Sequence, residues 1–204
     1  MTVLQSAAPH NSRKKLAAGL KTLVDIKADH KSWMKFSPPR RDRDNFLHPH
    51  PVFSVRLKKF LSGGSLSAAL KKTGWIYFLR DRGSKLVCAE VSIASGRHQN
   101  ARFTEGPFVK KLFEFIETVI GDSRIRRRQH ELRFLRVESI HLFCLWLREG
   151  RRVQHFIPVA SHSIILKQGA WISRGQFTKS LRLEGQRIRD AQERMSLLLK
   201  QYSG

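Results

Sequence analysis

Apolar residues recur three or four positions apart in three stretches of the chain, which predicts three helices. The pattern in residues 107–121 follows a proline suited to a first helical turn and stops at Gly121. A second pattern starts near Gln176 and runs to Tyr202. A third covers residues 11–28, with Ser12 as its predicted N-cap. The last helix of the chain is therefore expected to be long and amphipathic.

Shorter stretches rich in aromatic and β-branched residues predict strands. They are residues 75–80, 85–94, 131–148 and 151–159. The first two are joined by a polar turn and form a predicted hairpin. The third is read either as one strand or as two halves with a break near Ser139, and a turn at Gly150 joins it to the fourth. Residues 95–106 are polar and predict a loop.

The order of these elements is α-β-β-α-β-β-α once a short helix after Ser65 is set aside. This order predicts an α+β fold, with an antiparallel sheet built from two β-hairpins and helices packed on it. Three stretches are expected. Residues 1–61 form a basic arm with one helix and a proline-rich linker at 37–51, residues 62–160 form the α+β core, and residues 161–204 form a loop and the C-terminal amphipathic helix, which packs on the core or on a partner.

One predicted strand is apolar on both faces. Leu142, Cys144 and Trp146 share one face, and the other is shared by His141, Phe143, Leu145 and Leu147. A strand of this kind is expected to be covered on both sides. The terminal helices supply one possible cover and a second copy of the chain supplies another, so a homodimer is an open expectation.

Charge narrows the classes of partner. The 204 residues contain 39 Lys+Arg and 16 Asp+Glu, a formal net charge of +23. The surplus is spread along the chain, with +9 in residues 1–61, +9 in 62–160 and +5 in 161–204. A compact chain with this surplus repels itself unless an anionic partner or counterions neutralise it. The folded part is therefore expected to present a positive face to nucleic acid, an acidic protein or an anionic membrane.

Clusters of basic residues are the candidate nucleic-acid-binding groups. The densest lies in a connector between helix and strand, where guanidinium forks match phosphate oxygens. Asp122 lies just outside this connector and is expected to offset little of its charge. The candidate residues are Arg124, Arg126, Arg127, Arg128, Arg151, Arg152, Arg13, Lys14, Lys15, Arg40, Arg41 and Arg43. The alternatives are a solvated charged loop and a solubilising tail.

Other chemistry has weaker support in the sequence. Glu90 lies in the middle of a strand and is expected to pair with Arg80 or Arg133 rather than act as a base, because no nucleophile or histidine partner is identifiable. His130, His141 and His155 lie in or beside the later strands, but no metal-binding spacing accompanies them. No cofactor or metal motif is found. Trp75 and Tyr77 share a strand face and are expected to be core residues.

Targeting signals are weak as well. No apolar run reaches the length needed to span a bilayer, so no integral membrane association is expected. No secretory signal is visible, and the two cysteines, Cys88 and Cys144, are expected to be reduced and buried. Residues 1–24 lack acids and form an amphipathic pattern, which leaves an organellar presequence open. The expected location is the cytoplasm.

These observations favour a non-enzymatic, strongly basic protein that associates with DNA or RNA mainly through phosphate contacts. The alternative is a protein-interaction or dimerisation module whose charge steers an acidic partner. An enzyme built around Glu90 and a histidine, and binding of residues 11–28 to an anionic membrane surface, are further readings.

Overall fold

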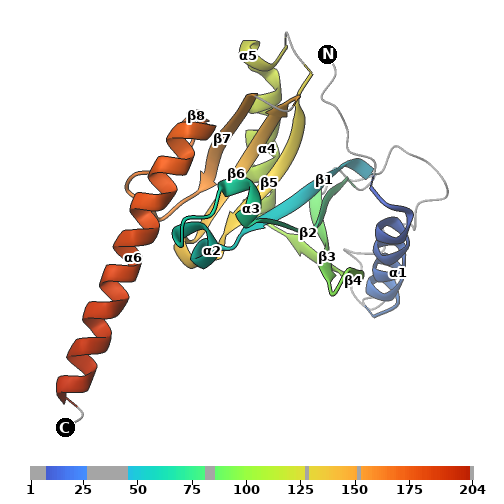
Figure 1. The fold of residues 1–204 in the computed structure, drawn as a ribbon. Coiled ribbons are helices and arrows are strands. Elements are labelled where there is room, and N and C mark those ends of the chain that lie inside the picture. Colours follow the sequence, from blue (N-terminus) through green and yellow to red (C-terminus); the bar gives the residue numbers. More distant parts are fainter. Residues whose placement is uncertain (1–7, 27–45, 81–85, 127–128, 151–152, 203–204) are drawn as a thin grey trace. The chain divides into compact units, whose positions relative to one another are not determined.

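Eight strands form one sheet in the part of the chain that the structure describes. The computed structural model describes residues 8–26, 46–80, 86–126, 129–150 and 153–202. The strands are β1 (Phe46–Val55), β2 (Leu70–Arg80), β3 (Leu86–Ala94), β4 (Arg97–Glu105), β5 (Glu131–Val137), β6 (Leu142–Glu149), β7 (Val153–Ala160) and β8 (Ile172–Ser173). The helices are α1 (His10–Ile26), α2 (Leu57–Leu61), α3 (Leu66–Ala69), α4 (Pro107–Gly121), α5 (Ser123–Arg126) and α6 (Arg174–Tyr202), with a 3-10 turn η2 at Glu138–Ile140 (Figure 1).

The strands follow one another in two runs. The sheet order is β4-β3-β2-β1-β5-β6-β7-β8, so β1 to β4 lead outward in one direction and β5 to β8 in the other. A helix follows each run, α4 after β4 and α6 after β8. The fold is therefore α+β with a long C-terminal helix, as the sequence predicts. The sheet holds more strands than the sequence pattern indicates.

The first strand that the sequence did not predict is β1. It begins at Phe46, inside the proline-rich stretch 37–51 that was expected to be a linker. Proline lacks the N–H that a strand donates to its neighbour, which is why Pro49 and Pro51 argued against a strand here. The two prolines are two residues apart, so both missing donors point to the same side of β1. His50, the one residue between them, keeps its N–H, which points to the other side of the strand.

The second unpredicted strand, β4, occupies the stretch 95–106 that was expected to be a polar loop. It pairs antiparallel with β3 and is the outermost strand of its run. Ala101 and Phe103 are half-buried, whereas Arg97, Asn100 and Arg102 are exposed. An outermost strand needs few apolar residues, so its composition resembles that of a loop.

Two further details of the sequence pattern are settled by the structure. Residues 131–148 form two strands, β5 and β6, separated by η2, so the alternative with a break near Ser139 is confirmed. The N-cap prediction for Ser12 is wrong because α1 already starts at His10, after Pro9. The Ser12 side chain is buried inside the domain instead.

The contacts within the chain divide it into two compact units. The first unit comprises Met1–Phe53 and Lys72–Phe134, and the second comprises Ser54–Lys71 and Leu135–Gly204. The three stretches that the sequence predicts, 1–61, 62–160 and 161–204, stay a prediction.

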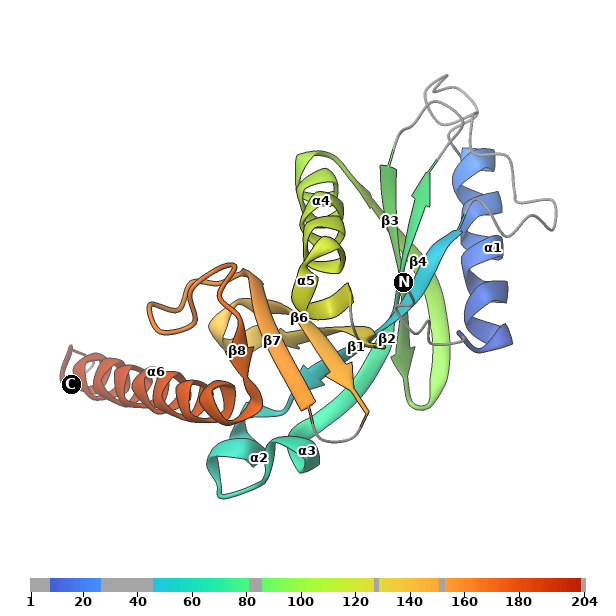
Figure 2. The same ribbon diagram turned by 90° about the horizontal axis from the view of Figure 1, so that it is seen from above.

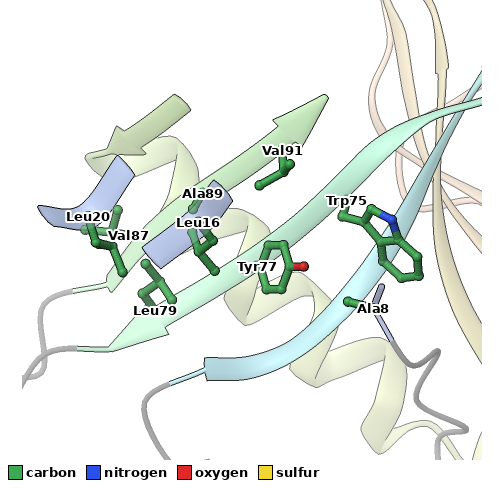
Figure 3. Close-up of a cluster of buried hydrophobic side chains, with 9 residues drawn as sticks. All are labelled: Ala8, Leu16, Leu20, Trp75, Tyr77, Leu79, Val87, Ala89 and Val91. Atoms are coloured by element: carbon green, nitrogen blue, oxygen red, sulfur yellow. The ribbon is translucent and has the colours of Figure 1, made fainter. Parts of the chain in front are cut away.

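The first unit has a helix on each face of its strands. Figure 2 shows β3 and β4 running between α1 and α4. Strand β2 is buried on both faces. Trp75 and Tyr77 pack with Leu16 of α1 (Figure 3), and the Phe78 ring lies 5.6 Å from the Phe113 ring of α4. The prediction that Trp75 and Tyr77 are core residues is confirmed, since each is 2 % exposed.

The second unit is held together by stacked aromatic rings. Strands β6 and β7 pair antiparallel, with Trp146 opposite Phe156. The Phe156 ring stacks on the Phe177 ring of α6 with 4.1 Å between centroids and on the Trp146 ring at 5.7 Å. The side chains of β6 from Cys144 to Leu147 are all buried. A single chain therefore covers this strand, and its two apolar faces no longer require a second copy.

Candidate nucleic-acid interface

Helix α1 of the first unit carries basic side chains around its exposed surface. Leu16 and Leu20 are buried against β2 and β3, which fixes the face of the helix that points inward. The other face carries Arg13, Lys14, Lys15 and Lys21, all exposed. No acidic residue occurs among residues 8–22, the part of this segment whose side chains the structure describes. We call these four cations the α1 basic face.

Two contacts fix α1 closely on the sheet. The Ser12 hydroxyl and the Tyr77 hydroxyl share a buried hydrogen bond of 2.7 Å. Gly19 lies against β4, where an added Cβ would come within 3.1 Å of both Ala101 Cβ and Phe103 Cε2. A larger side chain at position 19 would push the helix away from β4. The α1 basic face is therefore carried by a docked helix rather than by a loose arm.

The Tyr77 hydroxyl gives a pH-dependent test of this docking. Burial raises the pKa of Tyr77, and the Ser12 hydrogen bond and the Arg13 charge lower it by smaller amounts. A raised pKa means that the folded state loses stability as the pH rises above the ordinary tyrosine value of about 10. We expect Tyr77→Phe to lower the free energy of unfolding by about 1 kcal/mol at neutral pH, because the bond to Ser12 is lost.

The same substitution should flatten the loss of stability at alkaline pH. The measurement is urea unfolding of the native protein and the Tyr77→Phe variant on both sides of pH ~10. Tyr202→Phe, at an exposed tyrosine, is the matched control. Equal alkaline loss in all three proteins would contradict burial of the Tyr77 hydroxyl as its cause.

The connector after α4 carries less free charge than the sequence predicts. The Arg124 guanidinium donates two hydrogen bonds to the Asp122 carboxylate, Nε to Oδ1 at 2.9 Å and Nη2 to Oδ2 at 2.7 Å. The Arg124 backbone N–H also donates to Oδ1, at 2.8 Å. These bonds lower the pKa of Asp122 to about 2. Asp122 is thus paired with Arg124, and it offsets the charge of that one arginine of the connector.

Most other predicted binding residues lie outside the described part of the chain. Arg126 belongs to the short helix α5, and its side chain is not described. The residues outside the described ranges are Arg127, Arg128, Arg151, Arg152, Arg40, Arg41 and Arg43. Their part in binding stays a prediction.

A basic and aromatic cluster that the sequence did not reveal lies on three strands of the first unit. The Lys72 ammonium of β2 lies 3.7 Å from the centroid of the Trp75 ring. The Arg133 guanidinium of β5 lies 5.1 Å from the centroid of the Phe53 ring of β1 and is bonded to the Glu131 carboxylate. The sequence pattern placed Lys72 at the end of a helix, so the cluster becomes visible only once β1, β2 and β5 are neighbours in the sheet.

The charge balance of this cluster is positive. Burial lowers the pKa of Lys72, the nearby Arg133 guanidinium lowers it further, and the Glu131 carboxylate raises it. Two cations thus share one carboxylate. The cluster adds to the positive surplus of the first unit, but its Trp75 ring is too deeply buried to stack with a base.

The structure also places the other candidate groups, Glu90 and the histidines. The strand register places Glu90 between Ile76 of β2 and Arg102 of β4, so its basic cross-strand neighbour is Arg102 rather than Arg80 or Arg133. His141 lies beside His162, with 5.5 Å between ring centroids. Among the residues that the structure describes, no group of three or more metal-ligating side chains is suitably placed.

Neither cysteine forms a disulfide, and the expectation that both are buried holds for Cys144 but is wrong for Cys88. Cys144 is buried, and burial raises the pKa of its thiol, whereas Cys88 is half-buried. Within the described ranges no helix combines the length and the apolar character needed to cross a membrane.

Comparison with known proteins adds no function. The chain matches no protein-family model, no curated protein and no solved structure. The α1 basic face is the largest set of predicted binding residues that the structure describes together. It holds Arg13, Lys14 and Lys15, which the sequence analysis named, and Lys21, which was not among the candidate binding residues.

Proposed function

We propose that this protein is a non-enzymatic nucleic-acid-binding protein that holds phosphates mainly through the α1 basic face. The observation that carries the proposal is the set of four exposed cations on a docked helix, in a stretch, residues 8–22, that contains no acid. The one acid of the helix, Asp25, follows Lys21 by four residues. Phosphate contacts of this kind release counterions and supply most sequence-independent affinity for nucleic acid. Because the helix is already fixed on the sheet, little ordering entropy opposes binding.

The formal net charge of +23 supports the proposal, because it steers any polyanion to the protein. We include the remaining predicted basic residues in the interface as further phosphate contacts. They are Arg124, Arg126, Arg127, Arg128, Arg151, Arg152, Arg40, Arg41 and Arg43. Arg124 contributes least among them, since Asp122 already holds its guanidinium.

Two further predictions from the sequence concern the direction of the strands and the location of the protein. The strand pairings with a defined register, β2–β3, β3–β4, β6–β7 and β7–β8, are antiparallel. We propose that the other pairings follow them, so that the sheet is antiparallel throughout. The cytoplasm stays the predicted location.

The test is binding to single-stranded and duplex DNA and RNA over a salt series. We expect replacement of Arg13, Lys14, Lys15 and Lys21 by Gln to weaken binding at least about tenfold at physiological salt. The slope of log K against log salt for duplex DNA should fall by up to about 3.6, since each lost phosphate contact removes about 0.9. The loss should be uniform across base sequences, because phosphate contacts carry no sequence information.

A matched variant separates this face from the general charge. Replacing Lys58, Lys59, Lys110 and Lys111 by Gln removes the same four charges from other exposed positions on α2 and α4. We expect it to weaken binding much less. Equal weakening by both variants would mean that the charge acts without a defined site, and absence of binding at physiological salt would exclude the proposed function.

A protein-interaction module is the second candidate function. One observation favours it. Large apolar side chains on the C-terminal half of α6 are exposed, Met195, Leu198 and Tyr202 among them. Exposed apolar side chains that gather on one face mark an interaction surface.

A further inference from the structure

Helix α6 carries one apolar stripe that the second unit covers only in part. The stripe alternates steps of four and three residues along the whole helix. Its members are Phe177, Leu181, Glu184, Ile188, Ala191, Met195, Leu198 and Tyr202, all of them apolar or aromatic except Glu184. This is a heptad spacing, in which the stripe occupies the a and d positions of a two-helix coiled coil.

The first half of the stripe is buried. Phe177 and Leu181 are fully buried, and Phe177 stacks on Phe156 of β7. Glu184 is 5 % exposed, and its Oε2 lies 3.7 Å from Nη1 of Arg187, an ion-pair distance that is too long for a hydrogen bond. Gly185 lets the helix approach α2, since an added Cβ would lie 3.0 Å from the methyl groups of Leu61.

The second half of the same stripe is exposed. Met195 is 60 % exposed, Leu198 50 % and Tyr202 89 %. From Ile188 to Tyr202 the stripe is about 21 Å long at 1.5 Å per residue. This exposed half, which we call the seam, is about two heptads long. It continues the buried half of the stripe with the same heptad spacing.

The charged residues beside the seam indicate what covers it. With Ile188 at position a, the rim positions e and g hold Arg187, Gln192, Arg194 and Leu199. The acids Asp190 and Glu193 fall at positions c and f, away from the seam. The rim is therefore basic or neutral throughout.

A second copy of the chain does not complement this rim. In a parallel pair, Arg187 would face Gln192 and Arg194 would face Leu199 of the other helix, with no opposite charges. In an antiparallel pair the arginines would face one another. A partner helix with acids at its rim would pair with Arg194 and would end close to Arg187, which lies 3.7 Å from Glu184 of its own helix. The positive charge of the whole chain would steer such a helix to the site.

We propose that residues 188–202 of α6 bind an acidic amphipathic helix of another protein as a two-helix coiled coil. This inference gives the second candidate function its partner class and does not depend on nucleic-acid binding. A membrane surface is a poorer occupant, because the face of the helix opposite the stripe carries the acids Asp190 and Glu193.

The experiment measures binding of synthetic helical peptides to the full chain at physiological salt. The acidic probe is a peptide of about three heptads with Leu at positions a and d and Glu at e and g. A second peptide keeps the leucines and carries Lys at e and g, and a third keeps the glutamates and carries Ser at a and d. We expect the first to bind and the other two to bind at least about tenfold more weakly.

Variants of the chain locate the site. Met195→Ser with Leu198→Ser should weaken the acidic peptide at least about tenfold. Leu183→Ser with Leu197→Ser is the matched control, because both leucines are exposed but lie off the stripe. The control should leave peptide affinity within about twofold of the unsubstituted chain. All four residues are exposed, so both variants should keep the helical content and unfolding midpoint of the parent.

Several outcomes would overturn the proposal. Equal binding of the first and third peptides would reduce it to non-specific attraction of acids by a basic protein. Self-association that Met195→Ser with Leu198→Ser abolishes would assign the seam to a second copy. Binding to vesicles of phosphatidylserine and phosphatidylcholine that the same variant abolishes, without peptide binding, would assign it to a membrane. Nucleic-acid affinity should be unchanged by this variant, so the two proposals succeed or fail separately.

Discussion

Replacing Phe177 with alanine should lower the free energy of unfolding by about 3–5 kcal/mol, the largest effect that we expect for a single substitution in this chain. Phe177 is fully buried, and its ring lies nearly parallel to the Phe156 ring, with an angle of 13° between them. Phe156 in turn stacks on Trp146. Removing the ring opens a cavity next to two aromatic side chains that are fixed by a paired hairpin and cannot collapse to fill it.

Urea unfolding followed by tryptophan fluorescence measures this effect, with Trp146 as a nearby reporter. Phe108→Ala is the matched control, because Phe108 is 54 % exposed on α4 and should cost about 0.5 kcal/mol or less. A loss near that of the control at position 177 would show that α6 is not anchored to β7 through this ring.

The second large effect is expected at Gly74. Gly74 lies in β2 opposite Ser92 of β3. An added Cβ would come within 2.6 Å of the Val91 carbonyl oxygen and 3.1 Å of the Ser92 Cα. Both neighbours are backbone atoms, so neither strand gives way by a side-chain rotation, and Gly74→Ala should cost about 3 kcal/mol.

The matched control for Gly74 is Gly175→Ala in the first turn of α6, where an added Cβ meets nothing within 4 Å. That change should leave stability unchanged or raise it by up to about 1 kcal/mol, because alanine favours a helix. The midpoints of thermal unfolding of the two variants are compared. Their difference separates the cost of crowding at Gly74 from the change in backbone entropy that any replacement of glycine by alanine brings. Equal stability of both variants would exclude the close approach of β2 and β3 at this point.

The sequence predicted the elements whose pattern is set locally. The apolar spacing in α1, α4 and α6 arises from one face of one helix, and the apolar runs in β2 and β6 reflect burial on both faces. The pattern failed for β1 and β4. In β1 the prolines mask a strand that keeps its donors on one side, and in β4 an outermost position allows a polar composition.

The candidate sites divide in the same way, into features that residue spacing or composition predicts and features that depend on the folded geometry. Net charge alone predicted the class of partner, which stays a prediction. Arg13, Lys14 and Lys15 were named as a basic cluster of the N-terminal arm, and the structure places them on a helix that packs on the sheet. The pairing of Arg124 with Asp122 depends on the geometry of a turn, and the contacts of Lys72 depend on which strands are neighbours. Neither is encoded in residue spacing.

The strand order also bears on how the molecule meets other copies of itself. In the described part of the chain, β4 and β8 are the two strands with a neighbour on one side only. Such strands offer open backbone N–H and C=O groups as a template for further strands, the first step of amyloid-like growth. On β4, Arg97 and Arg102 place charges along that template, and β8 is two residues long. Growth of fibres by strand addition is therefore disfavoured at both of these strands.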